Sequence, residues 1–240
     1  MSRPRPANPL ILALDVSDAA AAIQLAQSVG PFVGALKIGM ELFTSTGPDL
    51  VRRIRDAGAQ VFLDLKFHDI PNTVAKAVAA ATRLDVQMLT IHAGGGAEMI
   101  RAAETAAQDT ARSLNRPAPL VLGVTVLTSM DSAQLASVTL ESDPGRHVER
   151  LATLATQAGL RGLVCSPLEL VGLRKILPEA TQLVTPGIRL TPPKPGDDQK
   201  RTLGPAEAIA AGADWLVVGR PIYAAPNPVA AAQEILKMVR

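Results

Sequence analysis

The sequence predicts an α/β fold, a TIM (β/α)8 barrel that occupies residues 1–240 as a single domain. Three observations predict this fold class. Short runs of aliphatic and β-branched residues alternate with alanine-rich segments of helical length, which is typical of parallel βα units. The runs number eight, which favours a closed barrel over an open sheet, and 240 residues suit one such domain. Residues 1–8, which are polar and proline-rich, are expected to form a flexible N-terminal extension.

Each expected strand is followed by a segment with helix signals. The strands are expected at Leu10–Val16, Phe32–Ile38, Gln60–Phe67, Val86–His92, Leu120–Val126, Gly162–Ser166, Gln182–Thr185 and Trp215–Gly219. Capping and terminating residues mark several helices: Ser17 before 18–29, Pro48 and Gly58 at the two ends of the next helix, Gly212 after 205–211, and a last helix at 229–239.

Composition and charge exclude several classes of function. The net charge is +2, aromatic residues make up 2% and no Lys/Arg run occurs, so we expect no nucleic-acid partner. The single cysteine, Cys165, cannot form an internal disulfide and is expected to be buried. The N-terminus lacks the apolar segment of a signal peptide, and no apolar run approaches the roughly 20 residues of a membrane span. A cytoplasmic protein without a membrane partner is therefore expected.

Charged residues occupy the carboxyl ends of the expected strands, where the active site of such a barrel lies. Asp15 ends the first strand and Lys37 the second, while the third carries Asp64 and Lys66, with Asp69 just beyond. Because strand side chains alternate, Asp64 and Lys66 share a face. Charges inside a barrel are costly to bury alone, so the alternating signs predict a network that neutralises itself. A purely structural salt-bridge network is the alternative, which the number of charges at strand ends disfavours.

The segments after the seventh and eighth expected strands predict a phosphate site. Gly219 allows a ligand to approach the backbone closely, and the Arg220 guanidinium can bind two phosphate oxygens. Residues 190–199, rich in proline and polar residues, directly follow Arg189. A segment of that length in a compact barrel is interpreted as a functional lid rather than a linker.

The ten residues from Asp64 to Thr73, DLKFHDIPNT, resemble the signature of the orotidine 5′-phosphate decarboxylase family. Further segments resemble this family in the same order: LALD at 12–15, LKIG at 36–39, LTSM at 127–130, VTPGIR at 184–189 with DQ at 198–199, and VGRPI at 218–222. The resemblance covers residues 9–237. The ten-residue motif is specific, whereas the wider DxKxxD pattern is shared with a larger superfamily.

The resemblance implies decarboxylation of orotidine 5′-monophosphate to uridine 5′-monophosphate and CO2, the last step of de novo pyrimidine synthesis, without a cofactor or a metal. It implies that Lys66 donates a proton to C6 of the pyrimidine and that Asp64 lies beside the leaving carboxylate. Lys37 and Asp69 would complete the charge network. Asp69 and Thr73 would belong to the partner subunit's site in a homodimer.

The resemblance also implies a set of substrate-binding residues. They are Asp15 and Lys37 for the ribose hydroxyls, with Thr73 from the partner; Thr128 and Ser129 for the pyrimidine; Gln199, Arg220 and the Gly219 backbone for the phosphate; and Arg189, which would position the phosphate loop.

The chemistry of the residues fits this reaction. Loss of the orotate carboxylate leaves a carbanion at C6, and no cofactor motif is visible that could accept its electrons. The protein must then stabilise the carbanion electrostatically. Lys66, placed among carboxylates, is expected to stay charged, which suits a proton donor and not a Schiff-base nucleophile.

Two alternatives remain open. One is a metal-dependent decarboxylase or aldolase of keto-sugar phosphates from the same superfamily, which would need an acidic metal ligand such as Glu41. The other is a non-catalytic nucleotide-binding barrel. The continuation Ile70–Thr73 and the segment Thr185–Arg189 favour the nucleotide decarboxylase, and occupied catalytic positions argue against an inactive barrel.

Overall fold

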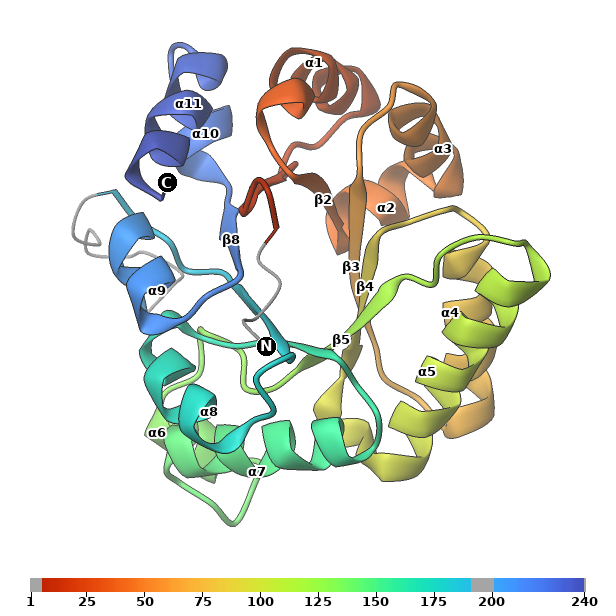
Figure 1. Cartoon of the computed structure of the whole chain (residues 1–240), viewed down its shortest axis with the longest axis vertical. Helices are drawn as coiled ribbons and strands as arrows, with labels where there is room; N and C mark the ends of the chain where they lie inside the picture. Colours follow the sequence, from red (N-terminus) through yellow and green to blue (C-terminus); the bar gives the residue numbers. More distant parts are fainter. Residues whose placement is uncertain (1–5, 191–200, 240) are drawn as a thin grey trace.

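Eight parallel strands close into a barrel in sequence order, with β1 paired to β8 (Figure 1). The structure is a computed structural model and describes residues 6–190 and 201–239. The strands are β1 Leu10–Ala13, β2 Ala35–Gly39, β3 Val61–Phe67, β4 Met88–His92, β5 Leu120–Val124, β6 Gly162–Val164, β7 Gln182–Thr185 and β8 Trp215–Val218. The predicted fold class is confirmed, although several strands end earlier than the apolar runs indicate.

The helices surround the sheet (Figure 1). They are α1 Ala19–Val29, α2 Met40–Thr46, α3 Pro48–Asp56, α4 Pro71–Thr82, α5 Gly96–Ser113, α6 Ser132–Ala136, α7 Pro144–Gln157, α8 Leu170–Ile176, α9 Pro205–Ala211, α10 Arg220–Tyr223 and α11 Pro228–Met238. Short 3-10 turns occur at Gly30–Phe32, Ala93–Gly95 and Pro167–Glu169. None of the described helices is both long and apolar enough to cross a membrane.

Helix starts follow the capping rules, with one correction to the sequence prediction. Pro48 begins α3 and Pro205 begins α9, as expected. The cap of α1, however, is Asp18 and not Ser17, because the Asp18 carboxylate accepts a hydrogen bond from the Ala21 N–H at 2.9 Å. A carboxylate at this position also interacts favourably with the positive end of the helix dipole.

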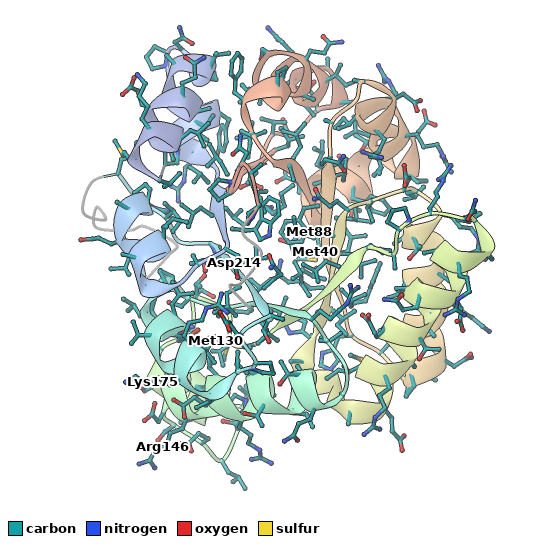
Figure 2. All side chains as sticks on the ribbon, viewed as in Figure 1. Met40, Met88, Met130, Arg146, Lys175 and Asp214 are labelled. Atoms are coloured by element: carbon teal, nitrogen blue, oxygen red, sulfur yellow. The ribbon has the colours of Figure 1, made fainter. Side chains whose placement is uncertain are left out.

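The barrel interior is filled by one apolar cluster, which is Ile11, Ala13, Ala35, Phe62, Met88, Leu122, Val184, Trp215 and Val217. Met88 lies in the centre of the barrel in Figure 2, whereas Arg146 and Lys175 project from its outer rim. Trp215 is 7% exposed, and its indole N–H donates to Gln182. Gly34 makes room for this ring, since a Cβ there would lie 2.9 Å from the ring carbon Cζ3.

A larger apolar cluster lies between the outer face of the sheet and the helices. Leu63, Leu65 and Phe67 of β3 belong to or pack against it, as the strand alternation predicts. The side chains between them therefore face inward. Phe62, Met88 and the rest of the interior cluster fill the barrel below the carboxyl ends of the strands. The inward positions nearer those ends can therefore carry polar groups.

Candidate active site

A cavity of about 390 Å³ opens at the carboxyl ends of the strands. Its volume lies within the range of small-molecule sites, about 300–1,000 Å³. Seven of the eight strands, or the segments that follow them, contribute to its walls, and β4 does not. The lining residues are Ala13, Asp15, Lys37, Phe62, Asp64, Lys66, Val124, Val126, Leu127, Thr128, Ser129, Val164, Cys165, Pro186, Gly187, Arg189, Val217, Gly219 and Arg220.

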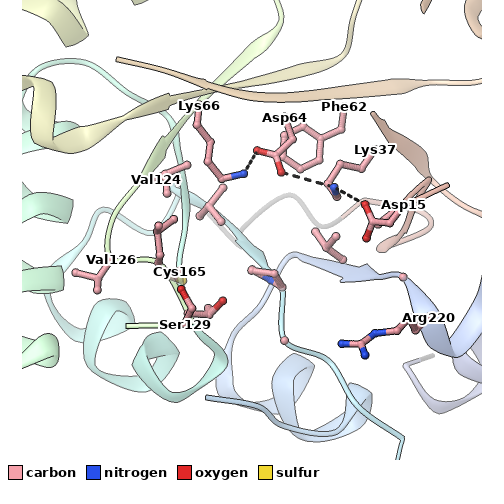
Figure 3. Close-up of a pocket in the computed structure, with 18 of the residues that line it drawn as sticks. Asp15, Lys37, Phe62, Asp64, Lys66, Val124, Val126, Ser129, Cys165 and Arg220 are labelled. Atoms are coloured by element: carbon pink, nitrogen blue, oxygen red, sulfur yellow. Dashed lines mark hydrogen bonds and ion pairs between the residues drawn. The ribbon is translucent and has the colours of Figure 1, made fainter. Parts of the chain in front are cut away.

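Four charged side chains form a chain of alternating sign along one wall (Figure 3). Lys66 Nζ lies 2.8 Å from Asp64 Oδ1, and Lys37 Nζ lies 3.7 Å from Asp64 Oδ2. Lys37 Nζ also lies 3.2 Å from Asp15 Oδ1. The Asp64 and Lys37 side chains are 14% and 12% exposed, so each depends on its neighbours for compensation. Four of the five charged residues predicted at the strand ends therefore lie together, and Asp69 does not line this cavity.

The environment of Asp64 favours its ionised form. Burial acts to raise the pKa of this carboxyl, but the charges of Lys37 and Lys66 and the hydrogen bonds from Lys66 and Thr90 outweigh burial. The pKa of Asp64 is consequently held below its usual value. Asp64 thus carries a negative charge into the cavity at neutral pH.

The backbone of β3 departs from regular alternation at the site. Leu63 pairs with Leu89 and Phe67 with Ile91, so four residues of β3 are matched by two of β4. Lys66 takes a φ of +52°, which non-glycine residues rarely adopt. Thr90 in β4 bonds both Lys66 and Asp64 and was not singled out from the sequence. A polar residue at an inward position of a strand that is otherwise apolar apart from His92 was the available signal.

The Arg220 side chain lies on the opposite wall of the cavity (Figure 3). Arg220 begins α10, directly after Gly219, and both line the cavity together with Arg189. A Cβ at Gly219 would lie 3.1 Å from Asp15 Oδ2, which is a tight contact, so glycine lets the end of β8 lie close to Asp15 without displacing its side chain. Gly219 and Arg220, which were predicted to bind the phosphate, therefore line the same cavity as Arg189, which was predicted to position the phosphate loop.

Apolar side chains complete the floor between the two walls. Phe62, Val124, Val164 and Val217 line the cavity, and sequence reasoning did not identify them as site residues. Thr128 and Ser129, which it did identify, lie at the edge after β5. Cys165 is 1% exposed, as expected, and burial raises the pKa of its thiol.

A buried ion pair fixes the segment before Thr128. The Arg201 guanidinium contacts the Glu169 carboxylate and donates to the Leu127 carbonyl oxygen at 3.1 Å. Glu169 in turn accepts a hydrogen bond from the Ser166 N–H at 2.8 Å. The chain just before α9 is thereby tied to the turns after β5 and β6, a connection that no sequence motif indicated.

Three predicted residues do not line this cavity in the described chain. Asp69 is exposed and accepts a hydrogen bond from the Ile70 N–H, and Thr73 is exposed in the first turn of α4. Gln199 and the segment 191–200 lie outside the described residues. His92 ends β4 with its ring 5.3 Å from that of His68, and burial, then the charges of His68 and Lys66, lower the pKa of His92.

The acidic residues near the site are dispersed. Among residues 6–190 and 201–239, no three His, Cys, Asp or Glu side chains converge in an arrangement that could hold a metal ion. Glu41 lies in the first turn of α2 and lines a separate, smaller cavity.

The fold and the site define the class of protein, a (β/α)8-barrel enzyme with a chain of alternating charges at the carboxyl ends of its strands. Residues 8–235 match the orotidine 5′-phosphate decarboxylase / HUMPS family, and the chain belongs to this family.

Named relatives agree with this assignment. The orotidine 5′-phosphate decarboxylase of Opitutus terrae is 52% identical over 95% of this chain and 96% of its own length. That of Moorella thermoacetica is 49% identical over 94% of this chain and 90% of its own length. The crystal structure of orotidine 5′-phosphate decarboxylase from Lactobacillus acidophilus has a TM-score of 0.86 at 33% identity and covers 97% of this chain and 99% of its own.

Proposed function

We propose that this chain decarboxylates orotidine 5′-monophosphate to uridine 5′-monophosphate, with Lys66 as the proton donor and without a cofactor. The reaction would be the last step of pyrimidine nucleotide synthesis. The single observation that carries the proposal is the Lys66–Asp64–Lys37 chain, which faces Arg220 across one cavity in a member of this family. One wall suits the reacting carboxylate and C6, and the other suits the phosphate.

The chemical step needs a stabilised carbanion. The bond between C6 and the carboxylate breaks with its electron pair left on C6, and CO2 departs. The Lys66 ammonium stabilises that charge and then transfers a proton from Nζ to C6. Lys66 afterwards regains a proton from solvent, which its 24% exposed side chain can contact. The sum is one nucleotide and one proton converted to product and CO2.

Asp64 would act on the substrate before the bond breaks. Its ionised carboxylate would lie beside the carboxylate of the substrate, and departure of neutral CO2 would relieve their repulsion. The same carboxylate holds Lys66 Nζ at 2.8 Å, which keeps the ammonium near C6. We assign the larger contribution to stabilisation of the carbanion, because preorganised charge is usually the largest single term in catalysis.

The remaining cavity residues would divide the substrate between them. Asp15 and Lys37 would bind the ribose hydroxyls, and Thr128 and Ser129 the pyrimidine edge. Arg220 and the backbone of Gly219 would hold the phosphate, with Gln199, and Arg189 would position the phosphate loop. The binding energy of the distant phosphate would thus be used to hold the ring against Lys66.

Turnover of the proposed substrate tests this function directly. Purified protein treated with EDTA is mixed with orotidine 5′-monophosphate, and the loss of ultraviolet absorbance is followed. Metal-independent conversion to uridine 5′-monophosphate is expected. Conversion of a keto-sugar phosphate that needs added magnesium would instead support the metal-dependent alternative. A folded protein that binds the nucleotide without single-turnover chemistry would be a non-catalytic barrel.

We further propose that the active enzyme is a homodimer in which Asp69 and Thr73 complete the partner's site. A second cavity of about 230 Å³ reaches the network from the side of α2 and is lined by Asp15, Lys37, Asp64 and Lys66. The chain's own Asp69 lines neither cavity. Two large apolar side chains on the flanking segments, Met40 and Ile70, are 54% and 66% exposed, which suits a surface that a second copy covers.

Mixed dimers test the shared site. Lys66→Ala and Asp69→Asn variants should each be inactive alone, because each dimer then lacks one essential group in both sites. When the two are unfolded together and refolded at equal amounts, about a quarter of the wild-type sites should reappear, since a symmetric interface places both mutations in the same site of each mixed dimer. Absence of any recovered activity, with mixed dimers verified by mass, would contradict the shared site.

A further inference from the structure

Thr90 occupies an unusual position in the sheet. It lies in the middle of β4 and is 0% exposed, although the strand is otherwise apolar apart from its last residue, His92. Its neighbours two residues away are Met88, which belongs to the barrel interior, and His92, so Thr90 also faces inward. A hydroxyl buried there must be hydrogen-bonded to be tolerated.

The hydroxyl of Thr90 joins the two central residues of the site. The backbone N–H of Lys66 lies 2.8 Å from Thr90 Oγ1, and Thr90 Oγ1 lies 3.0 Å from Asp64 Oδ1. A backbone N–H can only donate, so Oγ1 accepts from Lys66. The single proton of the hydroxyl is then available to Asp64, whose ionised carboxylate can only accept.

The register shift explains why this bond is needed. Between the pairs Leu63–Leu89 and Phe67–Ile91, β3 holds two more residues than β4. The Lys66 N–H therefore bonds a side chain of β4 where a regular ladder would offer a carbonyl. The φ of +52° at Lys66 is unfavourable for a side-chain-bearing residue and persists only where its surroundings hold it.

We propose that Thr90 is a positioning residue, which sets the place of the Lys66 ammonium by holding the Lys66 backbone and the Asp64 carboxylate with one hydroxyl. This inference rests on the proposed function of Lys66. Thr90 lines neither of the two cavities that the network borders, so it acts through its neighbours and not on the substrate. Asp64 Oδ1 receives both the Thr90 hydroxyl and the Lys66 ammonium, so a rotation of the carboxylate moves the ammonium with it.

Three variants test the proposal. Thr90→Val keeps the shape of the side chain and removes the hydroxyl, so kcat should fall by about 10- to 100-fold, the factor for losing one hydrogen bond to a charged group. KM should change by less than about 3-fold, because no group on the substrate loses a partner. Thr90→Ser retains the hydroxyl and should restore most of kcat. Thr82→Val is the matched control, since Thr82 is 4% exposed and its hydroxyl donates to the Val78 carbonyl within α4, away from the site.

The dependence of kcat on pH distinguishes a positioning role of Thr90 from a packing role, because a loss of packing alone would not shift the pKa of Asp64. The groups that face Asp64 are Lys37 from β2, Lys66 from its own strand, and Thr90 and His92 from β4. Only the Thr90 contact is removed by Thr90→Val. The pKa of Asp64 should then rise, and the acidic limb of the kcat profile should move to higher pH. The Asp64 carboxyl resonance, followed by NMR in the absence of substrate, should show the same direction.

The outcomes separate this inference from the proposed function. If the wild-type protein turns over orotidine 5′-monophosphate and Thr90→Val matches it in kcat and pH profile, the positioning role is wrong. If Thr90→Val and Thr82→Val lose activity and stability alike, with no change in the Asp64 pKa, the hydroxyl is merely structural and the proposal is overturned. If the wild-type protein is inactive but the Asp64 pKa still rises in Thr90→Val, the positioning of Asp64 is supported and the proposed reaction fails.

Discussion

Lys66→Ala is expected to abolish turnover of orotidine 5′-monophosphate while the protein still folds and binds the product nucleotide. If Lys66 acts as proposed, the substitution removes the proton donor and the positive charge beside C6 together, so kcat should fall by about 10⁴-fold or more. Affinity for uridine 5′-monophosphate should change by less than about 10-fold, because the product carries no charge at C6. Turnover is measured by absorbance, and binding by titration calorimetry.

The fold should survive because Asp64 keeps other partners. Lys37 Nζ remains 3.7 Å from Asp64 Oδ2, and the Thr90 hydroxyl bonds Oδ1. A carboxylate with these two contacts is not left as an isolated buried charge. Lys175→Ala is a suitable control, since Lys175 is exposed in the last turn of α8 and projects from the rim (Figure 2). Turnover of Lys66→Ala near that of the control would remove Lys66 as the acid.

The alternation of β3 made much of the charged wall of the candidate site predictable from sequence. Side chains two residues apart on a strand share a face, so Asp64 and Lys66 could be placed together and Leu63 and Phe67 assigned to the helices. The same rule could not reveal that the β3 backbone shifts its register against β4. That shift depends on pairing between strands, which the pattern of a single strand does not encode.

The unpredicted residues share this dependence on tertiary contacts. The Thr90 hydroxyl holds the backbone of β3 through a hydrogen bond from Lys66. Arg201 ties the chain before α9 to Glu169 and to the turn after β5. Both side chains are far in sequence from the groups they hold, and neither lies in a motif with its own chemistry. Phe62 was assigned to a strand, but the depth at which it closes the barrel follows from the other seven strands.

Asp69 and Thr73 are predicted site residues that the fold of a single chain does not bring to the cavity. Their place in the motif predicted a role in the site, yet in one chain both side chains are exposed and line neither cavity beside the network. A contact supplied by a second copy cannot follow from the fold of a single chain, and the mixed-dimer experiment addresses it.

Arg220→Ala is expected to lower kcat/KM for orotidine 5′-monophosphate by about 100-fold or more, because a bidentate, charge-assisted contact to the phosphate is lost. The same variant should change kcat/KM for orotidine, which lacks the phosphate, by less than about 3-fold. The two rate constants are measured on both substrates with wild-type and variant protein. Arg146→Ala, on the outer rim in α7, is the control for loss of a surface arginine (Figure 2).

The comparison of the two substrates separates binding energy from general damage to the site. Arg220 lines the same cavity as Lys66 but lies on the opposite wall, beside Gly219 (Figure 3). If Arg220 binds the phosphate, only the substrate that carries the phosphate can lose by its removal. If Arg220 instead shapes the end of β8 near Asp15, both substrates should lose equally, because the proposed binding mode places the ribose of both there. Equal losses would therefore assign Arg220 to the architecture of the site, and the phosphate would have to be held by the other groups after β7 and β8.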